Sequence, residues 1–199
     1  MNIGIDIDDT ISETYEVLLP YSQKYSIEDL KKRPCVNLKE KSKDHFYIKS
    51  INGWSHEECE KFWEKYYPEM MEKVNIKAFA AETINELREE GQKIFLISAR
   101  WNMENFDNKE VTLRWLKNND LTFDELILDT PDKLQFVKEN NIDLFIDDSF
   151  KNCSNIANNT STKVFLMNSK ANEGFEDEKV KRVYSWPEIK YLIDSRRDW

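Results

Sequence analysis

Residues that build structural metal sites are scarce in this sequence of 199 residues. It has only 2 histidines and 3 cysteines, an odd number without a CxxC spacing, and this argues against a structural zinc site. No apolar run reaches the ~18 residues of a membrane span. The first residues, MNIGIDIDDT, are acidic where a signal peptide would be basic. We therefore expect a reduced, soluble, cytoplasmic protein.

Positive charge is also in short supply. Lys and Arg total 29 against 38 Asp and Glu, which leaves a net charge of -9. Nucleic-acid backbones and anionic membranes both need a positive field, so neither a nucleic-acid polymer nor a membrane is an expected partner. The GxSxG, GxxxxGK[ST] and GxGxxG fingerprints are absent as well, and the sequence gives little support to the chemistries that use them.

The residues that are present can build a substantial core. The sequence is 40% hydrophobic and 13% aromatic, and its length suits one domain or one domain with an insertion. Five short apolar runs, rich in β-branched or aromatic residues, predict strands at 3–5, 93–97, 126–128, 143–146 and 164–166. Most are separated by helical patterns, which predicts an α/β fold, a Rossmann-like parallel sheet flanked by helices.

Two helices have readable boundaries. Phe79, Ile84 and Leu87 lie on one helical stripe, and Gly91 supplies a stop. Residues 185–188, Ser-Trp-Pro-Glu, predict a capping box with proline at the first helical position of a last helix.

The stretch from 13 to 77 does not fit a simple strand-to-helix connection. It follows the first strand directly, is helical and aromatic in pattern, and is far longer than the single helix that such a crossover needs. We expect residues 1–12 and 78–199 to form the α/β core domain, and 13–77 to form a small helical cap inserted after the first strand.

An acidic motif ends the first predicted strand, Asp6-Ile7-Asp8-Asp9-Thr10. Open parallel sheets bind ligands beyond the carboxyl ends of their strands. Asp6 and Asp8 are two residues apart, so both side chains project to one side of an extended backbone. Two adjacent carboxylates repel each other unless a cation lies between them or one keeps its proton. Taken alone, the motif is equally compatible with a polar turn.

Other strand ends carry polar residues too. Ser98 ends the second strand, where a hydroxyl and free backbone N–H groups would make a phosphate-sized cradle. Lys133 opens a helix, a poor place for a cation unless an anion accompanies it. Asp147 and Asp148 follow the fourth strand. Individually, a helix cap and a solvated lysine explain Ser98 and Lys133, but the ordered set indicates a phosphate site.

This set resembles the four motifs of the haloacid dehalogenase superfamily of phosphotransferases: DxDxT, Ser or Thr, Lys, and an acidic pair, here from Asp6 to Asp148. The insertion, the ISAR form of the second motif and the Asp-Asp pair resemble the 5'(3')-deoxyribonucleotidase family and its bacterial relatives. One departure is Ser98-Ala99-Arg100, where the nucleotidases typically have Thr-Ser-Pro. The departure bears on the choice of substrate.

The resemblance implies roles for the acidic residues. Asp6 would be the nucleophile that forms an aspartyl-phosphate. Asp8 would be the general acid for the leaving group and then the base that activates water. Mg²⁺ would be held by Asp6, the backbone carbonyl of Asp8 and Asp148, with Asp147 in support.

The resemblance also implies how the phosphoryl group is held. Ser98, Ala99 and Lys133 would bind its oxygens, and Lys133 would offset the charge that builds during transfer. Thr10 would orient the first loop. The implied enzyme is a phosphoric monoester hydrolase with Mg²⁺ as cofactor and a small phosphorylated metabolite as partner, here a nucleoside monophosphate.

The sequence leaves three questions open. The first question is whether the substrate is a nucleoside monophosphate, or instead a sugar phosphate or another small phosphorylated metabolite. The second question is whether Trp54 and Trp63 stack on a nucleobase or pack inside the cap, which their helical spacing favours. The third question is whether Arg100 contacts the substrate or pairs with an acidic neighbour. A binding module without catalysis is a further alternative, although no motif residue is missing. A phospho-accepting receiver domain is disfavoured, because its acidic pair ends the first strand rather than the fourth.

Overall fold

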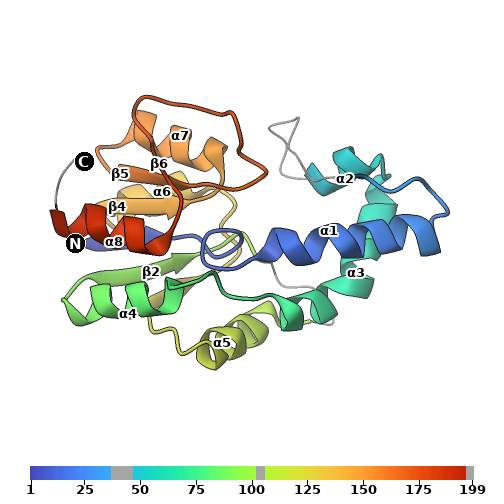
Figure 1. Cartoon of the computed structure of the whole chain (residues 1–199), viewed down its shortest axis with the longest axis horizontal. Coiled ribbons are helices and arrows are strands. Elements are labelled where there is room, and N and C mark those ends of the chain that lie inside the picture. The colour runs from blue at the N-terminus through green and yellow to red at the C-terminus, as the bar shows by residue number, and fades with distance from the viewer. Residues whose placement is uncertain (37–46, 102–105, 196–199) are drawn as a thin grey trace.

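The computed structural model describes residues 1–36, 47–101 and 106–195. A six-stranded parallel sheet lies in one half of the molecule, between helices on its two faces (Figure 1). The strand order is β3-β2-β1-β4-β5-β6. The strands are β1 (Asn2–Ile5), β2 (Lys93–Ile97), β3 (Glu125–Ile127), β4 (Leu144–Asp147), β5 (Lys163–Met167) and β6 (Lys181–Val183). All five expected strands are present. The three-residue β6 was not expected, because Lys-Arg-Val has no apolar run.

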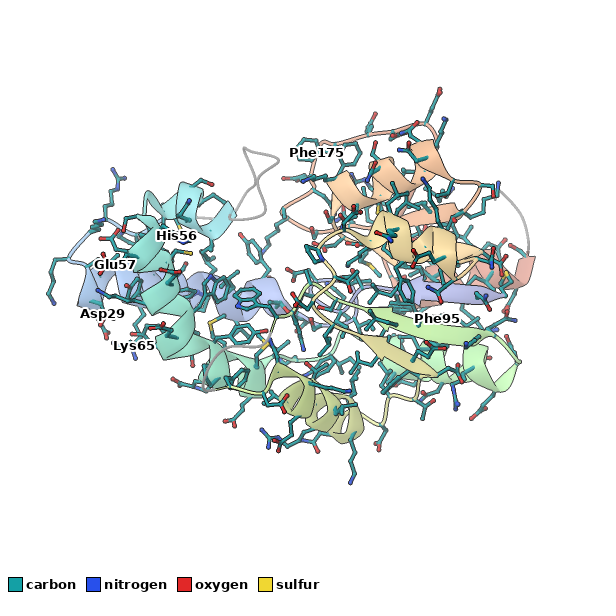
Figure 2. All side chains as sticks on the ribbon, turned by 180° about the vertical axis from the view of Figure 1, so that it is seen from behind. Asp29, His56, Glu57, Lys65, Phe95 and Phe175 are labelled. Carbon is teal, nitrogen blue, oxygen red and sulfur yellow. The ribbon has the colours of Figure 1, made fainter. Side chains whose placement is uncertain are left out.

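Helices cover both faces of this sheet. Their bounds are α4 (Ala80–Glu89), α5 (Asn108–Asn118), α6 (Lys133–Glu139), α7 (Phe150–Asn159) and α8 (Trp186–Ser195). Ile3 and Ile5 of β1 belong to one apolar cluster with residues of α4, α5 and α8. Phe95 of β2 (Figure 2) and Phe145 of β4 belong to a second cluster with residues of α6 and α7. Successive strand residues thus face opposite layers, and the predicted Rossmann-like α/β fold is confirmed.

The described part of the segment between β1 and α4 is largely helical. It contains α1 (Thr14–Lys24), a π-helical turn (Tyr25–Asp29), α2 (Tyr47–Asn52) and the long α3 (His56–Lys73). These helices lie to one side of the sheet, beyond the carboxyl ends of its strands (Figure 1). Lys65 of α3 pairs with Asp29 at the end of this helical layer that is remote from the sheet (Figure 2).

The long helix α3 has a well-formed start. The Ser55 side chain accepts a hydrogen bond from the Glu58 backbone N–H, and the Glu58 carboxylate accepts one from the Ser55 N–H. This reciprocal box satisfies two backbone donors that a helix start leaves unpaired. Within the predicted cap, residues 37–46 lie outside the described part of the chain, as do 102–105 and 196–199 of the predicted core.

Two details of the helix predictions need correction. Phe79 is not on the buried stripe of α4: it precedes the helix with φ of 64° and is 59% exposed, while Ile84 and Leu87 are buried. In α8, Ser185 accepts a hydrogen bond from the Glu188 N–H, but the Glu188 carboxylate accepts from the Tyr184 N–H, so only half of the expected box forms. Among the described residues, no helix has the length and apolarity to cross a membrane.

Candidate active site

The site lies where the winding of the sheet reverses. β1 pairs with β2 on one side and with β4 on the other, and the chain leaves β1 in one direction and β4 in the other. The Asp6 N–H donates to the Ile146 carbonyl over 2.9 Å, which places the start of the acidic motif beside the end of β4. Such a switch point is where open parallel sheets bind their ligands.

Three carboxylates meet at this point, and one ammonium group contacts two of them. Carboxylate oxygens of Asp6, Asp147 and Asp148 all lie within 4.8 Å of one another. Lys133, the first residue of α6, contacts Asp6 and donates to Asp147 over 2.9 Å. Asp6, Asp147 and Lys133 are buried. The fold thus brings together residues from the end of β1, the end of β4 and the start of α6.

Burial and charge act on these groups in opposite directions. Burial, against the attraction of Lys133, raises the pKa of Asp6 to about 7. Burial together with the neighbouring charges of Asp9 and Asp147 also raises the pKa of Asp148. For Lys133, burial disfavours the charged form, but Asp147 and Asp6 outweigh it and raise the pKa. The ammonium is therefore held charged, while the carboxylates resist carrying their full charge together.

Asp8 has quite different surroundings from Asp6. Arg100 grips it with two hydrogen bonds, from Nε over 2.9 Å and from Nη2 over 2.8 Å, and Thr14 donates to it over 2.7 Å. Burial by itself would raise the pKa of Asp8, but the charge and hydrogen bonds of Arg100 hold that pKa below its ordinary value. The pKa values of the two carboxylates of the first motif are thus shifted in opposite directions by their different surroundings.

Arg100 pairs with an acidic neighbour, one of the two alternatives that the sequence left open. The Arg100 side chain is 4% exposed, and its guanidinium also donates to the Thr112 hydroxyl over 3.1 Å. A substrate contact would have to compete with these bonds.

Ser98 and Ala99 lie on the loop that leaves β2. The buried Ser98 hydroxyl accepts from the Arg100 N–H over 3.2 Å, and the Ser98 carbonyl accepts from the Thr130 N–H over 3.1 Å. The second bond joins this loop to the one that leads into α6 and Lys133. Ala99 is exposed. Ser98 also lies 3.5 Å from Asp8, at the edge of hydrogen-bonding distance.

The acidic cluster fits a hard divalent cation. Asp6, Asp147 and Asp148 offer oxygen ligands from three side chains, and the raised pKa values of Asp6 and Asp148 indicate that a further positive charge would stabilise their ionised forms. Asp8 directs its side chain to Arg100, so its carboxylate is not part of the cluster. The resemblance noted in the sequence implied that only the backbone carbonyl of Asp8 would bind Mg²⁺.

The structure separates the two tryptophans that the sequence proposed as stacking residues. Trp54 is 5% exposed, packs against Tyr25 and Phe62, and donates to the Ser26 hydroxyl. The indole is enclosed by the helical layer, which agrees with the packing alternative that the sequence left open. Trp63 is only partly buried.

Trp63 leads to a residue that the sequence reasoning missed. It contacts Trp101 edge to face with ring centroids 5.9 Å apart, and Trp101 in turn stacks on Tyr67. Trp101 is 39% exposed and directly follows Arg100. Its place after the second motif was the available signal. Thr14, which binds Asp8, was also missed, since nothing in its local sequence marks it.

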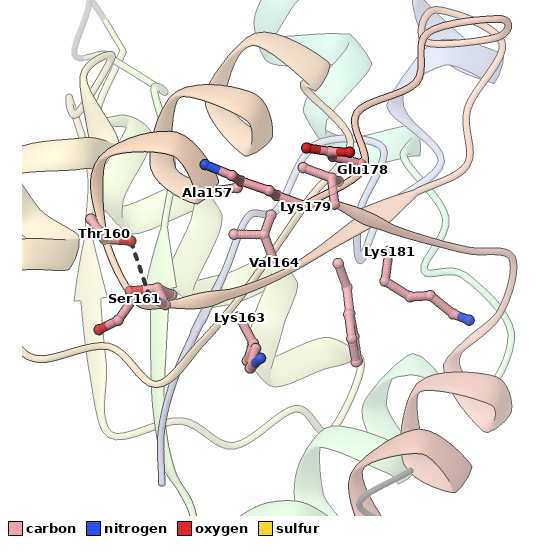
Figure 3. Close-up of a pocket in the computed structure, with 11 residues that line it drawn as sticks. Ala157, Thr160, Ser161, Lys163, Val164, Glu178, Lys179 and Lys181 are labelled. Atoms are coloured by element: carbon pink, nitrogen blue, oxygen red, sulfur yellow. Dashed lines mark hydrogen bonds between the residues drawn. The ribbon is translucent and has the colours of Figure 1, made fainter. Parts of the chain in front are cut away.

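A separate surface pocket of about 630 Å³ lies between α7, β5 and the segment before β6 (Figure 3). Lys163 and Lys181, the first residues of their strands, help to line it together with Thr160 and Lys179. It is therefore near the amino ends of the strands, away from the acidic cluster at their carboxyl ends, and none of the predicted site residues lines it.

Superposition on known structures identifies the class of fold to which this protein belongs. A haloacid dehalogenase-like hydrolase from Streptococcus pneumoniae superposes with a TM-score of 0.66, at 12% identity over 96% of this chain and 97% of the other. A predicted phosphatase from Clostridium acetobutylicum gives 0.69, at 12% identity over 98% of both chains. The protein has the haloacid dehalogenase-like fold.

Sequence comparison gives a nearer relative. A nucleotidase of Clostridium acetobutylicum is 27% identical over 195 residues, which cover 98% of this chain and 94% of the relative. No family model matches the chain. The expected resemblance to haloacid dehalogenase-type phosphatases and bacterial nucleotidases is confirmed, and at the level of class so is the prediction of a phosphoric monoester hydrolase.

Proposed function

We propose that this chain is a Mg²⁺-dependent phosphomonoesterase that acts on nucleoside monophosphates through an aspartyl-phosphate. The observation that carries the proposal is the buried Lys133 between Asp6 and Asp147, at the switch point of the sheet. It offsets the negative charge of a carboxylate that must attack an anionic phosphate. The nucleotidase named among the relatives supports this choice of substrate class.

The proposed cation would be held by Asp6 and Asp148, with Asp147 beside them. When bound, it supplies positive charge that polarises the phosphoryl group. Lys133 and the Ser98 loop hold the remaining phosphoryl oxygens in this proposal. Asp6 and Ser98 follow neighbouring strands of one sheet, so both can reach a single phosphate.

The proposed reaction has two balanced halves. First, an Asp6 oxygen forms a bond to phosphorus as the ester P–O bond breaks, and Asp8 gives its proton to the leaving oxygen. Then a water oxygen attacks the same phosphorus, Asp8 takes a proton from that water, and the bond to Asp6 breaks. Phosphate leaves and both carboxyl groups return to their starting state.

The geometry adds one requirement to this scheme. Both carboxylate oxygens of Asp8 are occupied, one by Thr14 and Arg100 Nη2, the other by Arg100 Nε. We therefore propose that the Asp8 side chain rotates away from Arg100 when substrate binds. Without the arginine charge that lowers its pKa, the carboxylate then takes up from solvent the proton that it gives to the leaving oxygen. In this proposal, Arg100 is the partner of Asp8 only while no substrate is bound.

We also propose that residues 13–77 act as a cap over the site. Helices α1 and α3 of this segment lie beyond the carboxyl ends of the strands, where they can exclude water and select the leaving group (Figure 1). Trp63, with Trp101 from the core, supplies the aromatic surface on which a nucleobase would stack.

The test is phosphate release from a panel of substrates. Deoxynucleoside and ribonucleoside monophosphates, sugar phosphates and p-nitrophenyl phosphate are compared with Mg²⁺ and with EDTA, and Asp6→Asn serves as the blank. Mg²⁺-dependent turnover that favours nucleotides is the expected result.

Other outcomes discriminate the alternatives. Turnover that favours sugar phosphates or other metabolites would keep the chemistry and overturn the substrate. A folded protein that binds Mg²⁺ but hydrolyses nothing would favour a phosphate-binding module.

A further inference from the structure

Asp148 is held by a different part of the chain from its neighbour Asp147. Asp147 accepts hydrogen bonds from Ser149 and Asn152 at the start of α7. Asp148 is bound instead by the loop that follows β5. Ser169 donates from its hydroxyl to Asp148 Oδ2 over 3.2 Å, and Asn172 donates from its amide to the Asp148 backbone carbonyl over 2.7 Å.

Asn172 is itself fixed on every side. It is 1% exposed, and its amide also donates to the Met167 carbonyl over 2.8 Å. Its side-chain oxygen accepts from the Ser169 N–H over 3.2 Å and from Arg182 over 2.5 Å. Arg182, on β6, further donates to the Asn172 backbone carbonyl over 3.1 Å. A buried amide with all its hydrogen-bonding positions used has one stable place, and so has the loop that carries it.

We propose that Ser169 and Asn172, braced by Arg182, are positioning residues that orient Asp148 for the divalent cation. The inference rests on the cation site of the proposed function. Asp148 is only partly buried and faces the like charges of Asp6 and Asp147, so without an external hold it would turn toward solvent. Ser169 opposes this at the carboxylate, and Asn172 opposes it at the backbone. Partners of metal-binding carboxylates act in this way, and their loss costs about 10–100-fold in metal affinity.

The first test measures Mn²⁺ binding to the whole protein by isothermal titration calorimetry, with no substrate present. Ser169→Ala removes the bond to Asp148 and should weaken Mn²⁺ binding by about 10-fold. Ser169→Thr keeps a hydroxyl and should bind Mn²⁺ close to the wild-type affinity.

Ser154→Ala is the matched control. The Ser154 hydroxyl also donates to a carboxylate, that of Asp177 over 2.6 Å, on a surface that has no part in the site. It should leave Mn²⁺ affinity unchanged. Equal Mn²⁺ affinity in Ser169→Ala and Ser154→Ala would overturn the proposal.

The part played by Arg182 is tested by thermal stability, because the loss of its hydrogen bonds to Asn172 also weakens the fold. For Arg182→Gln, which weakens the brace on Asn172, the rise in melting temperature on adding Mg²⁺ should be smaller than for the wild type. An undiminished rise would show that Arg182 supports only the fold, and would overturn its part in the proposal.

The outcomes separate this inference from the proposed function. A wild type that binds Mn²⁺ yet releases no phosphate would overturn the function and leave the positioning role intact. A wild type that binds no Mn²⁺ would overturn the cation site and the positioning role together.

Discussion

At the scale of single residues, the first motif contains two aspartates that the sequence presents as equivalents and the structure does not. Asp6 faces the Lys133 ammonium and two further carboxylates, and Asp8 faces the Arg100 guanidinium. Their pKa values move in opposite directions, to about 7 for Asp6 and below the ordinary value for Asp8. Unequal surroundings of this kind allow two carboxylates to take unequal roles.

Asp6→Asn should abolish turnover and leave the fold intact. The amide keeps the size of the carboxylate and can still accept from Lys133, but it cannot form the acyl phosphate. Steady-state phosphate release and a thermal melt check the two parts of this prediction. A near wild-type rate would rule out Asp6 as the nucleophile.

Lys133→Met should destabilise the metal-free protein by about 3–5 kcal/mol, because it leaves two buried carboxylates without their shared cation. Mg²⁺ should restore part of the loss. Urea unfolding with EDTA and with Mg²⁺ measures both effects.

Lys190→Met is a suitable control for the lysine variant. Lys190 also bridges several carboxylates, among them Glu90 and Asp194, but on the surface of α8. Its loss should cost no more than about 1 kcal/mol. Equal losses for the two lysines would contradict the special place of Lys133.

At the scale of elements, the long helix α3 has two aromatic faces with different partners. Phe62 faces the interior of the helical layer with Trp54 and Tyr25, whereas Trp63 and Tyr67 meet Trp101 of the core. Consecutive helix positions point about 100° apart, so neighbours in sequence can serve packing and the site separately.

Trp63→Ala should therefore raise KM for a nucleotide more than KM for p-nitrophenyl phosphate, since only the nucleotide carries a base to stack on the ring. Trp54→Ala is its control and should lower stability, by about 3–5 kcal/mol, without changing the preference between the two substrates. KM values for both substrates and urea unfolding provide the comparison. Equal rises in KM for both substrates in Trp63→Ala would count against stacking.

At the scale of the whole molecule, the acidic site opposes the stability of the fold that contains it. The pKa of Asp6 is raised to about 7 and that of Asp9 to about 6, in both cases chiefly by burial. The folded state therefore holds protons that the unfolded state has already released, and the free energy of unfolding falls as pH rises between about 4 and 7.

The EDTA-treated protein should lose melting temperature over this pH range, and Mg²⁺ should raise it more at pH 8 than at pH 5. Asp6→Asn should show a weaker fall, because it removes one of the titrating groups. Melting curves at several pH values test this. A Mg²⁺ effect that is the same at pH 5 and pH 8 would contradict it.

The sequence determined the class of fold and singled out the residues that we propose carry the chemistry. Short apolar runs mark β1 to β5, and burial on both faces of a parallel sheet confines polar residues to the strand ends, including the carboxyl ends where ligands bind. Asp6, Ser98 and Asp147 stand out there for that reason. The three-residue β6 has no such signal, and it was found only because it pairs with β5.

Tertiary structure alone decided the partners of these residues. Nothing near Asp8 in the sequence indicates that it would bind Arg100, 92 residues away, or that Ser169 would bind Asp148. Those pairings depend on which loops meet at the edge of the sheet. It also decided that Trp54 packs inside the helical layer while Trp63 reaches Trp101. Local periodicity fixes the face on which a side chain lies, but the element that covers this face is set by the path of the whole chain.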